Sequence, residues 1–551
     1  TDGGQRIYFC PLEKTDDQIS IYSGDGLLEQ VHVNLDVLET WTMHIKSMDS
    51  DGFLKVVLGD NKLVYSEKPE DNQLHRPMET PTDFDWNTAY GLFLDGQQWT
   101  YQNKYGQAYE SFEKCIEKDP YYAPALNQLA ALCYRKADYQ KGLEYAARSL
   151  SINTYDAEAN FNYGLINKRM GKLLDAQDGF SVASLTPSYR NAAYIELAKL
   201  MLTKKDLLTA KSYASKVIDV DQHNIEDNKL MAVIARKEGT SNEEYLQKIK
   251  SITKLDHFVD FEGWILKKDE ASKKLFLQGI KSELPQEIFM EMALWYQDAG
   301  CVEEAMELLR LSPPNALAYL QMAYLQKENR TVSQQYLEQA MQQSPDFVFP
   351  FRPEHVKVMS WAIGQTDNWK VKYYFALLQW KLGHLEEAKA LFDQCGNEPD
   401  YAPFYTAKSV LFGKEDNYDT KEDLLQANDL NPNDWRNAAN LIDYYLSLNQ
   451  SKDALKIATS ALKEFPDNSV LKYNHAKCLL ADGQYSECKK ALAKTTILPS
   501  EGARYGRLTY RQACVMESLG YYKKGKYSSA INSIQDARQW PENLGVGRPY
   551  V

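Results

Sequence analysis

The chain lacks two features that would place it in a membrane or on a nucleic acid. No stretch of its 551 residues approaches the roughly 18–20 uninterrupted apolar residues that a membrane-spanning helix needs. Positive charge is not in excess either, because 63 Lys and Arg residues stand against 76 Asp and Glu residues, for a formal net charge of −13. A protein that grips phosphate backbones concentrates positive charge on one face. The composition therefore predicts neither a membrane span nor a nucleic-acid partner.

Glycine, proline and cysteine are also sparse. The 28 glycines and 20 prolines are too few for a disordered or fibrous chain. The eight cysteines are scattered and form no C-x-x-C pair, which is typical of single buried thiols rather than of a disulfide framework. With 44% apolar and 25% charged residues, the chain has the composition of a globular protein with a large core.

Motifs for catalysis and metal binding are missing. The eight histidines form no H-E-x-x-H and do not cluster with cysteines, and no G-x-S-x-G marks a nucleophile. The segment from Gly520 to Lys526 fits the phosphate-binding pattern G-x-x-x-x-G-K. However, Tyr527 replaces the Ser or Thr that would hold Mg²⁺, and no strand precedes the segment. We therefore expect a turn between two helices at Gly525, and no catalytic residues, metal or cofactor.

Small residues recur every 34 residues in the first half of the chain, in two registers. Apolar residues follow the second register at offsets of four and seven, as Phe112 and Cys115 follow Ala108, which places them on one face of a helix. Pro120 then ends the unit. The two registers hold Gly96, Ala130, Gly164 and Ala198, and Ala108, Gly142, Ala176 and Ala210.

Such a unit, with two amphipathic helices, small anchor residues and a terminal proline, resembles the tetratricopeptide repeat. One hairpin cannot bury its apolar face alone, so neighbouring hairpins stack into a superhelix. Residues 1–67 differ, because they show the period-two alternation and turn signals of strands. The expected fold is mainly α: a right-handed α-solenoid of tetratricopeptide helical hairpins with a small N-terminal antiparallel β module.

The chain is expected to divide into five segments. A proline-containing linker follows the β module, and an insertion rich in proline and aromatic residues interrupts the repeat array. The first part of the array is irregular at 225–284. The boundaries are 1–67 for the β module, 68–86 for the linker, 87–345 for the first part of the array, 346–368 for the insertion and 369–551 for the second part.

Several segments inside the array stand outside the repeat consensus: YDAEANFNYG (155–164), LDHF (255–258), FPFRPE (349–354), LPSEGARYGR (498–507) and WPENLGVGRPY (540–550). Together they resemble the C-terminal portion of a bacterial family that joins a mutarotase-like β-sandwich domain of unknown function to tetratricopeptide arrays. The resemblance implies that the β-sandwich domain is either missing from this chain or represented only by residues 1–67 as its tail, in a setting of carbohydrate utilisation. In such a bacterium, unpaired thiols favour the cytoplasm over the periplasm.

Candidate partner-binding residues can be read from the repeat register. In tetratricopeptide arrays, positions 2, 5, 9 and 12 of the first helices usually face the concave groove, and here they are rich in aromatic residues. The same positions hold the cations Lys168, Lys199 and Arg236. The alternative is that these tyrosines simply pack adjacent hairpins. The candidate groove residues are Tyr134, Phe161, Tyr373, Trp380, Tyr405, Phe412, Tyr473 and Tyr522.

The predicted function is a non-enzymatic protein–protein interaction scaffold that uses this concave surface, because buried aromatic residues anchor peptides and helices. A protein or peptide is the expected partner, with the upstream β domain of the chain itself as one candidate. The Lys/Asn clamp of carboxylate-binding members is absent, since its places hold Phe93, Gln97, Gln128, Glu158 and Asn162. The alternative is an accessory region of a carbohydrate-active or glycan-binding protein, in which the aromatic faces stack on sugars.

Overall fold

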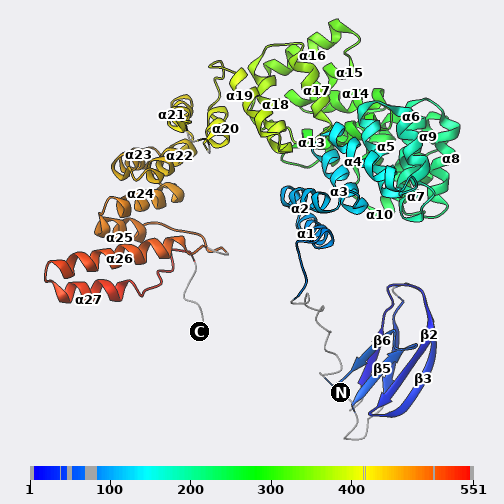
Figure 1. Ribbon diagram of the computed structural model, residues 1–551, viewed down its shortest axis with the longest axis horizontal. Coiled ribbons are helices and arrows are strands. Elements are labelled where there is room, and N and C mark those ends of the chain that lie inside the picture. The colour runs from blue at the N-terminus through cyan, green and yellow to red at the C-terminus, as the bar shows by residue number, and fades with distance from the viewer. Residues whose placement is uncertain are drawn as a thin grey trace. The chain divides into compact units, whose positions relative to one another are not determined.

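The computed structural model describes residues 5–37, 39–45, 53–68, 83–413, 415, 417–500 and 503–545 (Figure 1). The chain divides into two compact units, Thr1–Asn87 and Thr88–Val551, and each is described by itself. Residues 69–82, which make up most of the predicted linker, lie outside the described residues.

The first unit is a small antiparallel β module, as the alternation predicts. Its strands are β1 (Gln5–Phe9), β2 (Thr15–Ser23), β3 (Gly26–Leu35), β4 (Trp41–Ile45), β5 (Leu54–Leu58) and β6 (Leu63–Ser66). β1 pairs with β4 as a ribbon, and the other four form a sheet in the order β3-β2-β5-β6. The core between them holds Ile19, Ile21 and Val33 from the sheet, against which Phe9 and Trp41 of the ribbon pack.

The second unit is a solenoid of helical hairpins. Within the described residues, twenty-seven helices form thirteen consecutive hairpins, with α17 left over. The first eight hairpins are α1 (Ala89–Tyr101) with α2 (Tyr105–Lys118), α3 (Ala123–Arg135) with α4 (Tyr139–Ile152), α5 (Ala157–Met170) with α6 (Leu173–Ala183), α7 (Pro187–Thr203) with α8 (Leu207–Ile218), α9 (Ile225–Lys237) with α10 (Glu243–Ile252), α11 (His257–Lys267) with α12 (Glu270–Gly279), α13 (Pro285–Asp298) with α14 (Val302–Leu311), and α15 (Ala316–Leu325) with α16 (Arg330–Gln342).

The remaining helices begin inside the predicted insertion at 346–368. There α17 (His355–Ile363) packs against α15 and α18, so this segment is partly helical. Five hairpins come after it: α18 (Trp369–Leu382) with α19 (Leu385–Gln394), α20 (Ala402–Phe412) with α21 (Thr420–Leu430), α22 (Trp435–Ser447) with α23 (Ser451–Glu464), α24 (Ser469–Ala481) with α25 (Tyr485–Ala493), and α26 (Tyr505–Lys523) with α27 (Tyr527–Asp536).

The small residues at 34-residue spacing lie at the contact between the two helices of a hairpin. A Cβ atom on Gly96 would lie 2.5 Å from the ring of Phe112, and one on Gly164 would lie 2.6 Å from the ring of Phe180. Both rings are fully buried. The predicted anchors are therefore confirmed, because the phenylalanine of the second helix fills the space that a side chain on the first would need.

The repeat is also visible in the backbone. The turn inside each of the first five hairpins contains one residue with positive φ, and these residues are again 34 apart: Asn103 (58°), Ala137 (60°), Gly171 (81°), Lys205 (62°) and Gly239 (74°). Gly525, with φ of 70°, has the same place between α26 and α27. The G-x-x-x-x-G-K match is thus a hairpin turn, as predicted.

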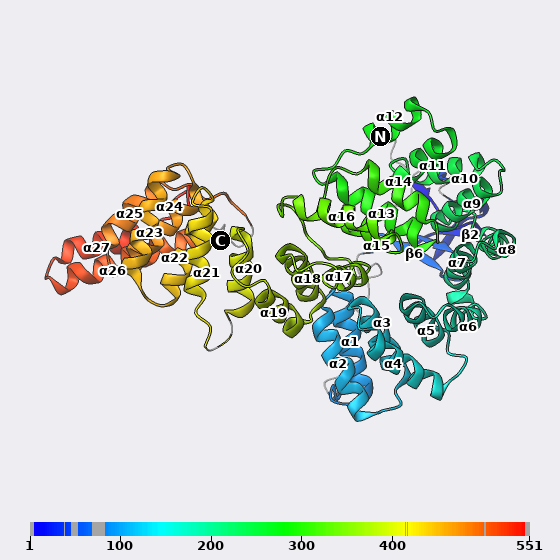
Figure 2. The same ribbon diagram turned by 90° about the horizontal axis from the view of Figure 1, so that it is seen from above.

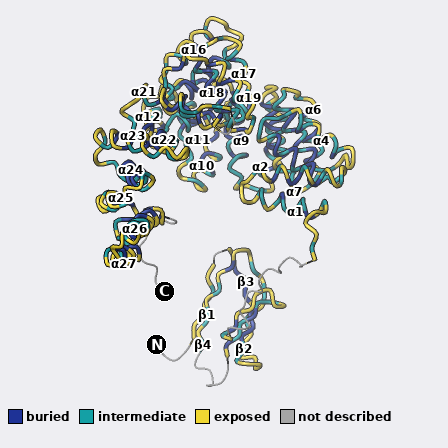
Figure 3. Tube along the Cα trace, turned by 60° about the vertical axis from the view of Figure 1, so that its left-hand side comes forward, coloured by how far each residue is buried: buried dark blue, intermediate teal, exposed yellow. Residues whose placement is uncertain are grey.

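In the second unit most buried residues lie within the helices, and the turns between helices are mostly exposed (Figure 3). One continuous core runs from Ala176 to Ala427, and two smaller cores serve the later hairpins. Seven of the eight cysteines are buried free thiols, whereas Cys10 is exposed, which corrects the expectation that all are buried. In the described part of the chain, no helix has the length and apolar character to cross a membrane.

Candidate functional site

Three of the predicted groove residues lie in the core. Tyr373, Tyr405 and Phe412 are only 5, 8 and 5% exposed. Tyr373 packs edge-on against Phe404 of the next hairpin, with ring centroids 5.4 Å apart, and the Tyr405 hydroxyl donates to the Pro399 carbonyl at 3.0 Å. These residues pack hairpin on hairpin and present little surface to a partner.

The other five predicted residues keep more exposure. Phe161 and Trp380 are partly buried against the main core. The Tyr473 hydroxyl shares a hydrogen bond of 3.1 Å with the Thr509 hydroxyl. Tyr522 is the most exposed, at 62%. Tyr134 is half-buried, and its hydroxyl accepts a hydrogen bond of 3.0 Å from Nε of Arg169.

The groove of α5 and α7 is closed by a later helix of the same chain. Lys168 and Lys199, both predicted to face the groove, lie 3.0 and 3.4 Å from the two carboxylate oxygens of Asp298 at the end of α13. Lys199 also lies 2.9 Å from Glu226, whose carboxylate accepts a hydrogen bond of 2.6 Å from the indole of Trp295. This part of the predicted groove is therefore occupied by α13.

Mutual stabilisation keeps these buried charges ionised. Burial opposes the charge of Asp298, but Lys168, Lys199 and Arg169 outweigh it and hold the pKa of Asp298 well below its usual value. Burial likewise opposes the charge of Lys199, but the neighbouring carboxylates outweigh it and raise the pKa of Lys199. Removal of one member of such a buried ion pair would leave the other charge buried without a partner, which is strongly destabilising.

A second network closes the groove at α9. Arg236 forms a two-pronged contact with Glu262 of α11, at 2.6 and 3.1 Å, and reaches Glu304 of α14 at 2.9 Å. Lys237 also binds Glu304, at 2.8 Å, and the Tyr296 hydroxyl donates to Glu262 at 2.6 Å. Arg236, a predicted groove position, is thus committed to the later helices as well.

A cleft lies where the first hairpins meet α17–α19. Figure 2 shows the backbone of these helices next to the first hairpins. The cleft consists of two adjoining cavities of about 620 and 910 Å³ that share Tyr139 and Arg169. We call it the junction cleft. One wall comes from the ends of α3 and α5 and the starts of α2 and α4, and the other from α15, α17, α18, α19 and the segment before α17. The insertion at 346–368 therefore supplies part of the second wall.

Aromatic and cationic side chains dominate the junction cleft. Aromatic residues line both walls, among them Tyr134 and Tyr139 on one side and Tyr324 and Trp361 on the other. Burial lowers the pKa of Lys357, and the charges of Arg169 and Lys327 lower it further. The cations are Arg135, Lys136, Arg169, Lys327, Lys357 and Lys381, against the acids Asp138, Glu354 and Glu387.

Several of these cations have no carboxylate partner in the part of the chain that the structure describes. Arg135 lies over the ring of Tyr105 at 4.1 Å from its centroid, and Lys327 lies over Tyr324 at the same distance. Lys381 is exposed at the rim. In a chain of net charge −13 such a cleft presents an unusual density of positive charge next to aromatic surface.

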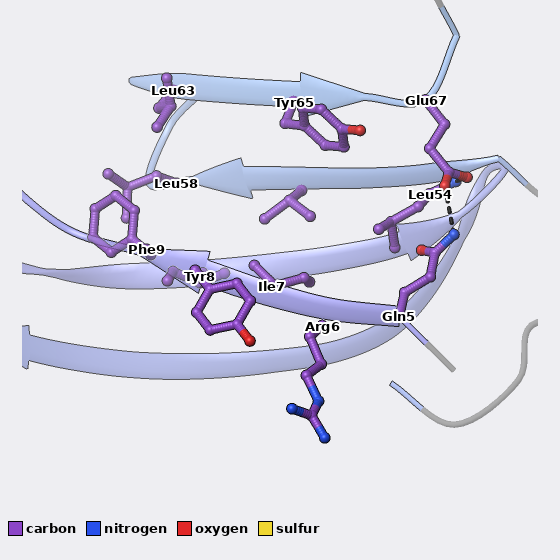
Figure 4. Close-up of a pocket in the computed structure, with 12 residues that line it drawn as sticks. Gln5, Arg6, Ile7, Tyr8, Phe9, Leu54, Leu58, Leu63, Tyr65 and Glu67 are labelled. Atoms are coloured by element: carbon purple, nitrogen blue, oxygen red, sulfur yellow. Dashed lines mark hydrogen bonds between the residues drawn. The ribbon is translucent and has the colours of Figure 1, made fainter. Parts of the chain in front are cut away.

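The β module has a cavity of its own, of about 460 Å³, between β1 and the β5–β6 edge (Figure 4). Its lining is largely apolar and includes Ile7, Leu58 and Tyr65. Gln5 and Glu67 close one end through a hydrogen bond of 2.5 Å. Among the described residues no group of three or more His, Cys, Asp or Glu residues is placed to hold a metal ion.

Sequence reasoning reached Tyr134 but missed the junction cleft, because its two walls come from segments about 200 residues apart. It also assigned Lys168, Lys199 and Arg236 to a partner surface. The only local signal was a cation at helix positions that hold aromatic residues in many other repeats. It did not reveal that Asp298, Glu262 and Glu304 would bind these cations.

Comparisons with known proteins agree with the repeat assignment. Residues 445–508, from the end of α22 into α26, match the family described as tetratricopeptide repeat. No curated protein matches the chain.

Solved structures with similar folds include a tetratricopeptide repeat protein from Parabacteroides merdae, with 14% identity, coverage of 46% of this chain and 98% of that one, and a TM-score of 0.34. PilF of Pseudomonas aeruginosa has 19% identity, coverage of 38% and 95%, and a TM-score of 0.33. Yeast Tom70 has 15% identity, coverage of 82% and 91%, and a TM-score of 0.24. At these scores the likenesses say nothing about partners. The matched repeat and the thirteen hairpins together identify a chain that contains tetratricopeptide repeats.

Proposed function

We propose that this chain is a non-enzymatic scaffold that binds a protein partner in the junction cleft. Tetratricopeptide repeats generally mediate protein–protein interaction, which supports this class of function. The groove residues of α5, α7 and α9 are bound to later helices, so a partner needs another surface. The observation that carries the proposal is the contact between Tyr134, which lines the first cavity, and Arg169, which lines both.

The residue types of the cleft suit protein recognition. Tyrosine, tryptophan and arginine are the side chains that most often dominate binding energy at protein interfaces. Tyr139 and Trp361 offer broad apolar faces, and the cations around them supply directional contacts to backbone carbonyls or carboxylates. The upstream β domain implied by the family resemblance, and a glycan as the alternative ligand, stay predictions from the sequence.

Selection of peptides from a random display library against the full chain tests the proposal. Selected peptides are measured by fluorescence anisotropy against the wild type and against a double variant, Lys327→Glu with Lys381→Glu, which reverses two exposed charges at the cleft. We expect binding to the double variant to be at least tenfold weaker, because two favourable charge contacts become repulsive.

The matched control is the double variant Lys114→Glu with Lys118→Glu, which makes the same charge change on two exposed residues of α2 outside the cleft. Its peptide affinity is expected to equal that of the wild type. Peptides that bind the double variant as tightly as the wild type would show that the junction cleft is not the binding surface.

A further inference from the structure

The last hairpin of the described residues exposes a continuous apolar face. On α26 it consists of Leu508, Val515, Leu519 and Tyr522, which are 55, 39, 43 and 62% exposed. On α27 it consists of Tyr527, Ile531 and Ile534, which are 62, 58 and 44% exposed. The spacings place each set on one side of its helix. The rings of Tyr522 and Tyr527 lie 5.7 Å apart and join the two sets into one surface, which we call the terminal face.

The preceding hairpin shows what normally covers such a face. Gly483 and Gly525 have the same left-handed turn geometry, with φ of 78° and 70°, and they align α24–α25 with α26–α27 at an offset of 42 residues. At this offset Ile534 corresponds to Leu492. Leu492 is fully buried in a core that includes Ala513 of α26, whereas Ile534 is 44% exposed. The terminal face therefore includes the position through which α24–α25 packs against the hairpin that follows it.

The terminal face is not a polar end cap. End repeats of a solenoid ordinarily carry a polar outer face that keeps them soluble. Here apolar residues take the place of charged ones. The positions of Lys477 and Lys489 in the preceding hairpin are held by Leu519 and Ile531 in this hairpin. Contiguous exposed apolar surface of this kind marks an interaction site.

The charges around the terminal face are positive. The only two acidic residues within 504–538 are Glu517 and Asp536, and Lys489 of α25 binds each of them at 3.0 Å. No carboxylate partner is found, within the residues that the structure describes, for the exposed cations on this hairpin. These are Arg504, Arg511, Lys523, Lys524, Lys526 and Arg538. A second copy of the chain would bring this positive rim against itself, whereas an acidic helix would neutralise it.

We infer that the terminal face is a docking site for an amphipathic helix whose apolar stripe is flanked by acidic residues. The helix packs on α27 and α26 as α26 itself packs on α25, so that its stripe covers Leu519, Ile531 and Ile534. Its carboxylates then lie among the cations of the rim. This site is separate from the junction cleft and does not depend on it.

The test uses a fluorescent synthetic peptide of heptad pattern, with leucine along one stripe and glutamate on both flanks. A second peptide keeps the leucines and carries lysine in place of glutamate. Both are titrated against the full chain by anisotropy at about 0.1 M salt. We expect saturable binding of the acidic peptide and at least tenfold weaker binding of the lysine peptide. Equal affinity for the two peptides would overturn the inference that the terminal face selects a helix with acidic flanks.

Two variants locate the site, Leu519→Lys and Ile531→Lys. Both install the residue that the preceding hairpin carries at the equivalent position, so the repeat fold accommodates them, and circular dichroism checks this. Each is expected to weaken binding of the acidic peptide at least tenfold. The control, Leu208→Lys, makes the same change at a 79% exposed leucine of α8 and should leave the affinity unchanged.

Two results would contradict the inference. One is an affinity for the acidic peptide that survives both lysine variants. The other is a dimer of the wild type in sedimentation that Leu519→Lys abolishes, because the occupant would then be a second copy. The Lys327→Glu and Lys381→Glu double variant should bind the acidic peptide normally, so failure at the junction cleft and failure at the terminal face are distinguishable.

Discussion

The guanidinium of Arg169 in α5 donates a hydrogen bond of 2.7 Å to the carboxylate of Glu354, which lies 185 positions later in the chain, just before α17. Both side chains are about three-quarters buried. In an open array of repeats, each hairpin contacts only its neighbours. This contact, together with the one from Lys168 to Asp298, closes part of the array on itself.

A double-mutant cycle measures that closure. Arg169→Met and Glu354→Gln, singly and together, should give a coupling of about 1–2 kcal/mol in the free energy of unfolding, because the pair is part-buried and lies between distant segments. Chemical denaturation followed by circular dichroism provides the four values. The surface pair Lys248 and Glu244, one turn apart on α10, is the control and should show a coupling below about 0.5 kcal/mol. A coupling near zero for Arg169 and Glu354 would mean that the closure does not depend on them.

Substitutions at two turn residues with positive φ, Gly171 and Lys205, should change the stability of the protein in opposite directions. A Cβ atom on Gly171 would meet no other atom within 4 Å, so Gly171→Ala costs only the left-handed backbone, about 1 kcal/mol. Lys205 has the same conformation one repeat later, and Lys205→Gly should raise the stability by up to about 1 kcal/mol. Thermal unfolding of both variants gives the comparison. Shifts of the same sign in the two unfolding temperatures would contradict the left-handed backbone conformation of Gly171 and Lys205.

Stability should fall in mild acid because of His355. Burial lowers its pKa to about 3, helped by the charge of Arg352, whereas the unfolded chain titrates near 6.5. Between pH 6.5 and pH 3 the unfolded state therefore binds a proton that the folded state excludes, and stability falls by up to about 1.4 kcal/mol per pH unit. In the variant His355→Leu this contribution should vanish. Identical pH profiles of denaturation for the two proteins would refute the assignment.

Asp227 should act in the opposite sense. Burial, with the nearby Glu226 and Asp221, raises its pKa to about 8 from the ordinary 3.8, and neither carboxylate oxygen finds a hydrogen-bond partner among the described residues. The folded state thus keeps a proton that the unfolded state loses between pH 3.8 and pH 8, so stability decreases as the pH rises through that range. Asp227→Asn should flatten this slope in denaturation curves taken from pH 4 to pH 9. A wild-type slope that persists in the variant would be incompatible with a protonated Asp227.

The local part of the fold could be predicted from the sequence, and the long-range part could not. Ala108, Ala176 and Ala210 recur at a fixed spacing because each hairpin solves the same packing problem, so their burial can be read from the pattern. The contact of Lys199 with Asp298 depends instead on small rotations that accumulate over several hairpins. No local sequence pattern encodes this accumulated rotation. The junction cleft could not be predicted from the sequence for the same reason.

The exposure of the predicted groove residues cannot be predicted from their position within one helix. Position alone does not separate Tyr405, which is 8% exposed, from Tyr522, which is 62% exposed. The difference comes from the neighbours that each helix has along the array. Tyr405 is covered by its neighbouring hairpins, whereas no further hairpin follows α27 among the described residues.

The closure of α5 onto α17 implies two regimes of motion in one chain. Amide hydrogens in α5–α9 can exchange with solvent by local opening only if contacts to α11, α13, α14 and α17 break as well, so this body should exchange slowly and as a unit. Among the described residues, the hairpin α26–α27 packs against only one neighbouring hairpin, so it can open more easily. Hydrogen exchange should therefore fall off steeply from the last hairpin towards the closed body. A helix that docks on the terminal face would be detected first as newly slowed exchange at that end.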